Sequence, residues 1–116
     1  MNQSQNQNFT VKRNDTIKWT ITITEDGAVV DITGWSFFFT VKTSIDDVDA
    51  DALIKVDWSS HSDQENGETI LTVPAASTNL TGQKYYDLQY KDDSGEIHTL
   101  LWGYITFDKD VTIRTS

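Results

Sequence analysis

The acidic segment DDVDAD, which contains Asp47, Asp49 and Asp51, has the residue types for metal binding. Its alternating aspartates have the spacing that opens a helix–loop–helix calcium loop. Such a loop also requires glycine at its sixth position and glutamate at its twelfth. Counted from Asp47, these positions hold Ala52 and Trp58. The sequence therefore predicts a solvated loop, and we expect neither a metal site nor a cofactor.

His61 and His98, the two histidines of the chain, are the candidates for acid–base chemistry. A nucleophilic triad needs a serine held on a sharp turn beside the histidine. The serines around His61 lie instead in a polar connection, SSHSDQENG, without such a turn. No glycine-rich phosphate loop is present, and no feature predicts a rigid cleft with paired carboxylates. We expect two surface histidines and no enzymatic activity.

Large aromatic side chains provide the third candidate site. Along the segment 98–108, apolar residues alternate on both faces of a predicted strand. If Ile105 and Phe107 point into the core, Trp102 and Tyr104 must point away from it. The same alternation places the side chains of Tyr85 and Phe38 on the outward faces of their own strands. The sequence predicts an exposed docking patch, formed by Phe38, Tyr85, Trp102 and Tyr104.

Two functions suit such a patch, because exposed aromatic clusters mark protein interfaces or sugar-binding platforms. In a protein interface the four rings would dock on a partner or on a second copy of the chain. In a carbohydrate-binding module they would stack on sugar rings, and Asp87 would accept sugar hydroxyls. We favour protein docking and keep carbohydrate binding as the alternative. The N-terminal segment could also cover this face, which would leave no patch.

Short strands with a period of two would position these residues. In TIKWTITIT, the apolar Ile17, Trp19, Ile21 and Ile23 share one face, and lysine and threonines share the other. Similar runs, separated by turn residues, predict an all-β sandwich. The predicted strands cover residues 9–13, 16–24, 28–32, 35–42, 52–58, 68–73 and both arms of a hairpin within 82–112, with one helical turn over 74–80. The expected core contains Trp19, Ile21, Phe37, Phe39, Val56, Leu88 and Ile105.

Composition sets limits on organisation and partners. The 116 residues suit one domain, which we place at residues 9–116 after a flexible polar tail over residues 1–8. No cysteine is available for a disulfide or a thiolate metal site. The net charge of −9 opposes nucleic-acid binding. Neither a membrane span nor a signal peptide is apparent, so we expect synthesis and use without export and no membrane partner.

Several turn and strand motifs together resemble a family of domains from tailed bacteriophages. The segment Asp26–Gly34 (DGAVVDITG) is similar to the family pattern dG-x-x-vDLTG. The motifs that complete the resemblance are Asn14-Asp15-Thr16, Asn66-Gly67, Thr78-x-Leu80-x-Gly82-x-x-Tyr85-Tyr86-Asp87-Leu88, Asp93-Ser94-Gly95-x-x-x-Thr99-Leu100-Leu101-x-Gly103 and Asp110-Val111-Thr112. Together they extend from Thr10 to Thr112. The family comprises the immunoglobulin-like domains of baseplate upper proteins and of related tail and tail-fibre proteins.

The resemblance implies an antiparallel immunoglobulin-like β-sandwich of seven or eight strands. It also implies a virion structural or assembly protein, made in the bacterial host cytoplasm, whose partners are other phage structural proteins. In baseplate proteins of this kind the domain attaches a receptor-binding part to the tail. For this chain we expect no receptor-binding or oligomerising part after the sandwich, which departs from that pattern. We therefore expect either a free-standing adaptor or one domain of a longer product.

Overall fold

The structure, a computed structural model, describes residues 5–44 and 52–108. The acidic segment with Asp47, Asp49 and Asp51, which is predicted to be a solvated loop without a metal site, lies outside the described residues, as does the closing Asp110-Val111-Thr112 motif. The described chain is all β apart from two short 3-10 turns. These turns are η2 (Gln64–Asn66) and η3 (Ala75–Thr78).

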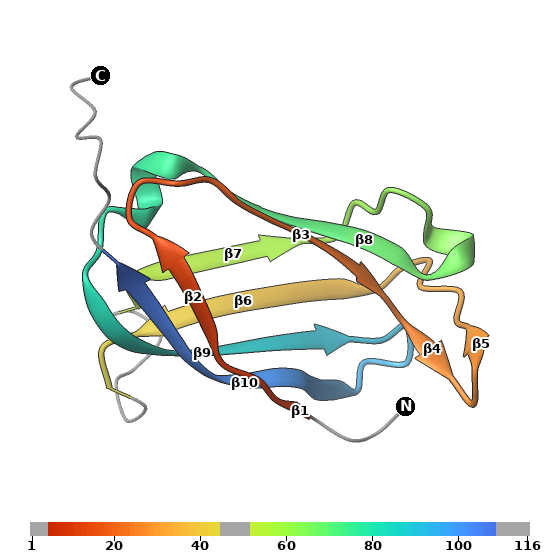
Figure 1. Ribbon diagram of the computed structural model, residues 1–116. Helices are drawn as coiled ribbons and strands as arrows, with labels where there is room; N and C mark the ends of the chain where they lie inside the picture. The colour runs from red at the N-terminus through yellow and green to blue at the C-terminus, as the bar shows by residue number, and fades with distance from the viewer. Residues whose placement is uncertain (1–4, 45–51, 109–116) are drawn as a thin grey trace.

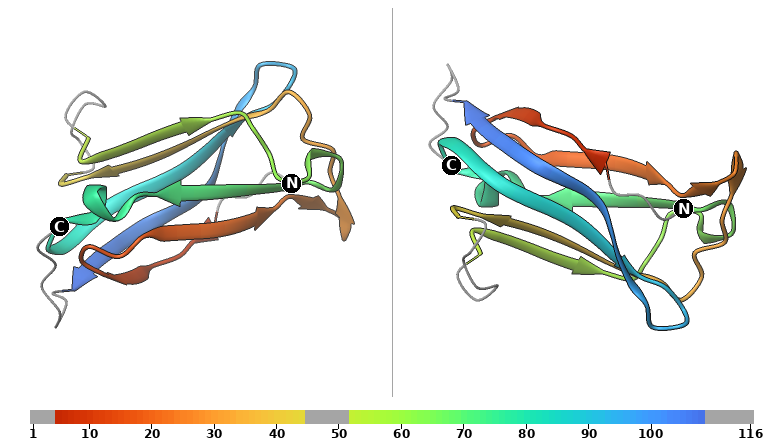
Figure 2. Two further views of the ribbon diagram at one scale, coloured as in Figure 1. Left: turned by 90° about the horizontal axis from the view of Figure 1, so that it is seen from above. Right: turned by 90° about the horizontal axis from the view of Figure 1, so that it is seen from below.

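The strands form two packed layers, which Figure 1 and Figure 2 show from three directions. The larger sheet has the order β1-β10-β9-β6-β7, and β2 also pairs with β10. Its strands are β1 (Gln5–Asn6), β2 (Phe9–Lys12), β6 (Ser36–Lys42), β7 (Ile54–Trp58), β9 (Gly82–Lys91) and β10 (Ile97–Asp108). The second layer pairs β3 (Ile17–Thr22) with β8 (Glu68–Val73), and a small hairpin pairs β4 (Thr24–Glu25) with β5 (Ala28–Val29).

This architecture confirms the predicted all-β sandwich. The described residues contain ten strands rather than seven or eight, because β1, β4 and β5 are short pairings of two residues each. Pairing is antiparallel except at one edge, where β1 and β2 run parallel to β10. The predicted helical turn over residues 74–80 is present as η3.

The core lies between the two layers and contains the predicted apolar faces. Phe37, Phe39, Leu88 and Ile105 are fully buried, and Ile21 is nearly so. The other two predicted members, Trp19 and Val56, are half-buried at the margin of this core. Trp19 contacts an aromatic cluster there: its ring centroid lies 4.5 Å from that of Phe9 and 5.5 Å from that of Phe39.

A β-bulge corrects the prediction for one leucine of β10. Simple alternation places Leu100 on the outer face with Trp102. The pairing with β9 instead shifts between Thr99 and Leu101, which leaves Leu100 as an extra residue. Both Leu100 and Leu101 therefore pack against the core. Beyond the bulge the alternation resumes, and Trp102 points outward as predicted.

Residues 5–8, the second half of the predicted tail, lie against β10 in the structure. β1 pairs with Leu101 and Trp102, and the backbone N–H of Gln7 donates to the Trp102 carbonyl at 2.9 Å. The Asn8 side chain accepts a hydrogen bond from the Tyr104 N–H at 2.9 Å. Without this segment, part of the outer edge of β10 would have unpaired backbone groups. The segment is held by hydrogen bonds to that edge, so it needs no apolar side chains. Residues 1–4 lie outside the described residues.

Candidate docking face

The outer face of the larger sheet carries three rows of side chains that run across the strands. Residues paired across neighbouring strands stand side by side on the same face. The middle row joins β7 to β10 and then reaches β1, in the order Lys55, Thr40, Asp87, Trp102 and Asn6. Trp102 and Asp87 are therefore direct neighbours on this face.

A parallel row lies on each side of the middle one. The first consists of Lys42, Tyr85 and Tyr104. The second consists of Asp57, Phe38, Gln89 and Thr99. We refer to these three rows together as the groove face, because their side chains line a hollow of about 920 Å³.

All four residues of the predicted docking patch lie on the groove face. Trp102 and Tyr104 on β10 are 46% and 39% exposed, whereas Phe38 and Tyr85 are half-buried. The rings of Tyr85 and Tyr104 contact each other, with centroids 5.2 Å apart. Within the described part of the chain, Phe38 and Trp102 make no ring contact. We call Tyr85, Trp102 and Tyr104, which stand on β9 and β10, the aromatic ridge; within it only Tyr85 and Tyr104 contact each other, and Phe38 stands on the neighbouring β6.

The alternation of side chains along the β9–β10 hairpin could not predict the polar residues of the groove face. The sequence did not single out Lys42, Lys55, Asp57 or Gln89, although the same outward phase on β6, β7 and β9 contains them. Finding them required the strand order, which places β7 next to β6 and β6 next to β9. Ile97, which is 60% exposed and lines the hollow, was missed for a different reason: the bulge at Leu100 changes the phase of β10, so simple alternation back from Trp102 assigns Ile97 to the inner face.

The N-terminal strand forms one wall of the hollow and does not cover it. Asn6 lines the hollow, and its side-chain amide donates to the Trp102 carbonyl at 3.2 Å. Close approach of this strand depends on Gly103. A Cβ on that residue would lie 2.6 Å from both the Gln7 carbonyl oxygen and the Asn8 side-chain oxygen. The suggestion that the N-terminal segment hides the aromatic patch is therefore wrong for the described residues, since Trp102 and Tyr104 stay exposed.

His61 is a structural residue rather than a surface histidine. Its Nδ1 lies 2.9 Å from the Thr69 hydroxyl oxygen, and its Nε2 lies 2.9 Å from the Trp35 carbonyl oxygen. The indole N–H of Trp58 donates to the same Thr69 hydroxyl at 2.7 Å. His61 therefore ties the connection after β7 to β8 and to the residue that precedes β6, and both of its ring nitrogens lie within hydrogen-bond distance of these partners.

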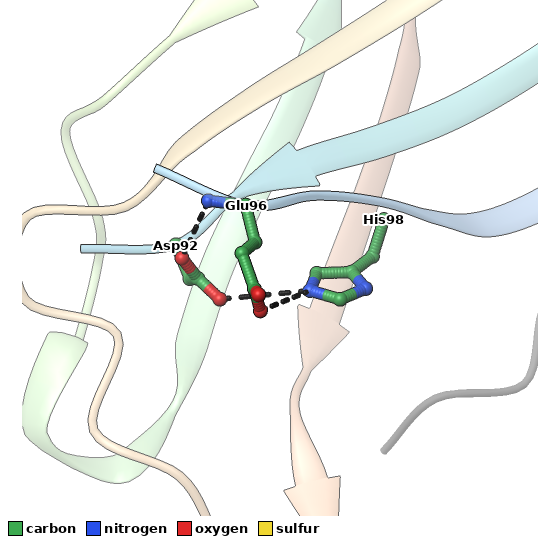
Figure 3. Close-up of side chains that lie close together, drawn as sticks. All are labelled: Asp92, Glu96 and His98. Atoms are coloured by element: carbon green, nitrogen blue, oxygen red, sulfur yellow. Dashed lines mark hydrogen bonds and ion pairs between the residues drawn. The ribbon is translucent and has the colours of Figure 1, made fainter. Parts of the chain in front are cut away.

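His98 belongs to a small polar cluster at the β9–β10 turn (Figure 3). Its Nε2 lies 3.5 Å from an Asp92 carboxylate oxygen and 3.7 Å from one of Glu96. The other Asp92 oxygen accepts hydrogen bonds from the N–H and hydroxyl of Ser94 and from the Glu96 N–H. These bonds, the Ser94 hydroxyl first, lower the pKa of Asp92. The carboxylate therefore closes the turn, and the three donor atoms are close enough to hold a cation.

Two packed layers of strands define a β-sandwich domain, and the larger sheet carries a hollowed face with aromatic residues. The family of the chain is shown by its match, over residues 1–101, to the family model of the BppU N-terminal domain, the N-terminal domain of baseplate upper proteins. The chain belongs to this family, which confirms the predicted one. It is a structural protein of the bacteriophage baseplate and a virion component. The family indicates a non-enzymatic role and interaction with other phage structural proteins.

No curated protein matches the chain. Among the described residues, no helix has the length and apolar character needed to cross a membrane.

Proposed function

We propose that this chain is an attachment module of the baseplate, which docks on another virion protein through the groove face and acts without catalysis. One observation carries this proposal. A member of a baseplate family presents a hollow of about 920 Å³ whose rim holds two exposed aromatic residues, Trp102 and Tyr104. Soluble proteins seldom leave large aromatics clustered in water unless a partner covers them.

The position of these rings suits an anchor at the centre of an interface. Trp102 and Tyr104 project from the long strand β10, which is paired on both sides, so their backbone is held in place. A rigid aromatic anchor loses little conformational entropy when a partner covers it, and truncating such an anchor typically costs about 2 kcal/mol or more of binding free energy. The polar residues around them, Asp87 and Asn6 among others, would supply directional hydrogen bonds.

Assembly of virions provides the test. A phage lacking this gene is grown in cells that supply either the unaltered chain or the double variant Trp102→Ala with Tyr104→Ala. Because both rings are exposed, we expect the variant to fold with a nearly unchanged melting temperature. We also expect it to be absent from, or strongly depleted in, purified virions. The exposed pair Thr20→Ala with Thr22→Ala, on β3 of the other sheet, is the matched control and should be incorporated normally.

Normal incorporation of the folded Trp102→Ala, Tyr104→Ala variant would contradict the proposal. Carbohydrate binding remains a distinguishable result of the same variants. If the unaltered chain binds immobilised glycans, and the double variant loses that binding while still entering virions, the groove face is a sugar site and not an attachment surface.

A further inference from the structure

We propose that the groove face also recognises itself: two copies of the chain stack groove face on groove face around a twofold axis that runs parallel to the strands between β6 and β9. This inference rests on the proposed function, because it takes the groove face to be a docking surface, and it names the partner as a second copy. The charges of this face and the order of its residues across the strands carry the argument.

Charge is the first requirement for self-association, because the chain has a net charge of −9 and two copies repel each other. The groove face is locally balanced. Its charged residues are Lys42 and Lys55, with Asp57 and Asp87, so the positive and negative charges cancel. Two copies can therefore approach through this face without the penalty that their net charge would impose elsewhere.

The row order then shows which groups would meet. A twofold axis along the strands between β6 and β9 preserves the position along the strands and exchanges β10 with β7 and β9 with β6. In the middle row, Trp102 of one copy then lies opposite Lys55 of the other. In the same row, Asp87 lies opposite Thr40. In the next row, Tyr85 lies opposite Lys42.

Each of these pairs is favourable, and each occurs twice. The Lys55 ammonium lies 3.3 Å from the Asp57 carboxylate of its own chain at the surface, and it can stand over the face of Trp102 of the other copy. The Lys42 ammonium can do the same over Tyr85, and each arrangement is a cation–π contact. The Thr40 hydroxyl can donate to the Asp87 carboxylate. In the remaining row, Asp57 faces Thr99, so no two like charges are opposed. The aromatic ridge of each copy thereby enters the lysine side of the hollow of the other.

The alternative axis, across the strands through the middle row, is disfavoured. It would place Asp87 opposite Asp87 and Lys55 opposite Lys55, and like charges directly opposed across an interface are costly. Face-to-face sheets pack about 10 Å apart, with strand directions within about 30° of each other. The axis along the strands is compatible with this aligned packing.

Sedimentation of the purified chain tests the interface. We expect a concentration-dependent monomer–dimer equilibrium for the unaltered chain. Trp102→Ser should raise the dissociation constant about thirtyfold or more, as expected for loss of an aromatic anchor. Lys55→Glu should raise it roughly tenfold. Lys18→Glu makes the same charge change on an exposed residue of β3, in the other sheet, and should not raise it.

Site-directed cross-linking tests the axis. The chain contains no cysteine, so single cysteines can be introduced without background. The inferred axis brings Thr99 of one copy opposite Asp57 of the other. A mixture of the Thr99→Cys and Asp57→Cys variants should yield a covalent dimer with a short bis-maleimide reagent. Either variant alone should not, because its two cysteines would lie at opposite margins of the interface.

Three results would overturn the inference: a monomer at all concentrations, a dimer that Trp102→Ser and Lys55→Glu leave intact, or a dimer without the Thr99–Asp57 cross-link. Lys55 is an exposed residue, so its variant reports on the interface even if the tryptophan variant fails to fold. A chain that stays monomeric but whose Trp102→Ala, Tyr104→Ala variant is lost from virions would refute self-recognition and retain the attachment function. A dimer that breaks in this variant while incorporation stays normal would refute attachment and retain self-recognition.

Discussion

The Tyr86 hydroxyl connects the sheet to the N-terminal strand, since it donates to the Gln7 carbonyl at 2.6 Å. Burial raises the pKa of Tyr86 to about 12. In the unfolded chain a tyrosine titrates at about pH 10. Between about pH 10 and about pH 12 the unfolded chain has lost a proton that the folded chain keeps, so the free energy of unfolding falls as pH rises.

Tyr86→Phe should therefore lower stability at neutral pH and flatten this alkaline decline. The decline should not vanish, because burial also raises the pKa of Tyr90. Urea unfolding at about pH 8 and about pH 11 measures both effects. Tyr104→Phe, at an exposed position, is the matched control. An alkaline slope unchanged by Tyr86→Phe would show that this phenol does not keep its proton on folding.

Leu100 and Trp102 lie two residues apart on β10, but they should contribute differently to the free energy of unfolding. Leu100 packs against the core through the bulge, whereas Trp102 is 46% exposed. Leu100→Ala should lower the free energy of unfolding by about 1–2 kcal/mol, less than for a fully buried leucine. Trp102→Ala should change it by about 0.5 kcal/mol or less. Thermal unfolding of both variants under monomeric conditions makes the comparison, and equal losses would contradict it.

At the scale of elements, β1 and the two residues after it depend on the absence of a side chain at Gly103. Gly103→Ala should displace residues 6–8 from β10, because the new methyl group would meet backbone and side-chain oxygens at 2.6 Å. We expect a loss of roughly 2 kcal/mol and faster hydrogen exchange at the Tyr104 N–H. Gly82→Ala is the control: it shares a positive φ but has nothing within 4 Å of the added methyl group. It should leave exchange at Tyr104 unchanged, and equal effects of both variants would contradict this role of Gly103.

Strands with one buried face were predictable from the sequence. The predicted strand over 68–73 is β8 with the same bounds, and the alternation around Phe37 and Leu88 gave the correct buried faces. Where pairing rather than side-chain pattern decides the structure, the prediction was wrong or incomplete. Residues 28–32 form only the short β5, yet Ile32 is fully buried beyond its end.

The N-terminal strand and the bulge show the same limit. Residues 5–8 are held by backbone and amide hydrogen bonds, which leave no apolar period in the sequence. The bulge at Leu100 is likewise invisible to a period of two, because an extra residue changes the phase without changing composition. The outward position of Phe38, Tyr85, Trp102 and Tyr104 was predictable, because the alternation within each strand assigns their side chains to the outer face. The polar half of the groove face depends on the strand order.

At the scale of the whole molecule, carboxylates gather at one end of the sandwich. The β4–β5 hairpin, η2 and the β9–β10 turn lie together at this end in Figure 1 and Figure 2. The described carboxylates on these segments are Glu25, Asp26, Asp63, Glu65, Asp92, Asp93 and Glu96. Mutual repulsion at this end should lower stability when salt does not screen it.

Raising the salt concentration from about 0.02 M to about 0.2 M should therefore raise the melting temperature by a few degrees. This shift corresponds to a gain of about 0.5 kcal/mol in the free energy of unfolding. The double variant Asp93→Asn with Glu65→Gln should melt higher at low salt and respond less to added salt. Asp108→Asn, at the opposite end and 3.8 Å from the Lys12 ammonium, should not increase low-salt stability. A melting temperature that falls with salt in the unaltered chain would contradict this account.

The parallel edge of the larger sheet has a consequence for the order of events during synthesis. β1 and β2 leave the ribosome early, and β10, on which they depend, leaves it last among the described strands. Asn8 and Tyr104, which share a hydrogen bond, are 96 residues apart in the chain. Such distant pairing is slow to form. While β10 is still in the exit tunnel, β1 and β2 have no strand to pair with, so this domain completes its fold only after translation has passed β10.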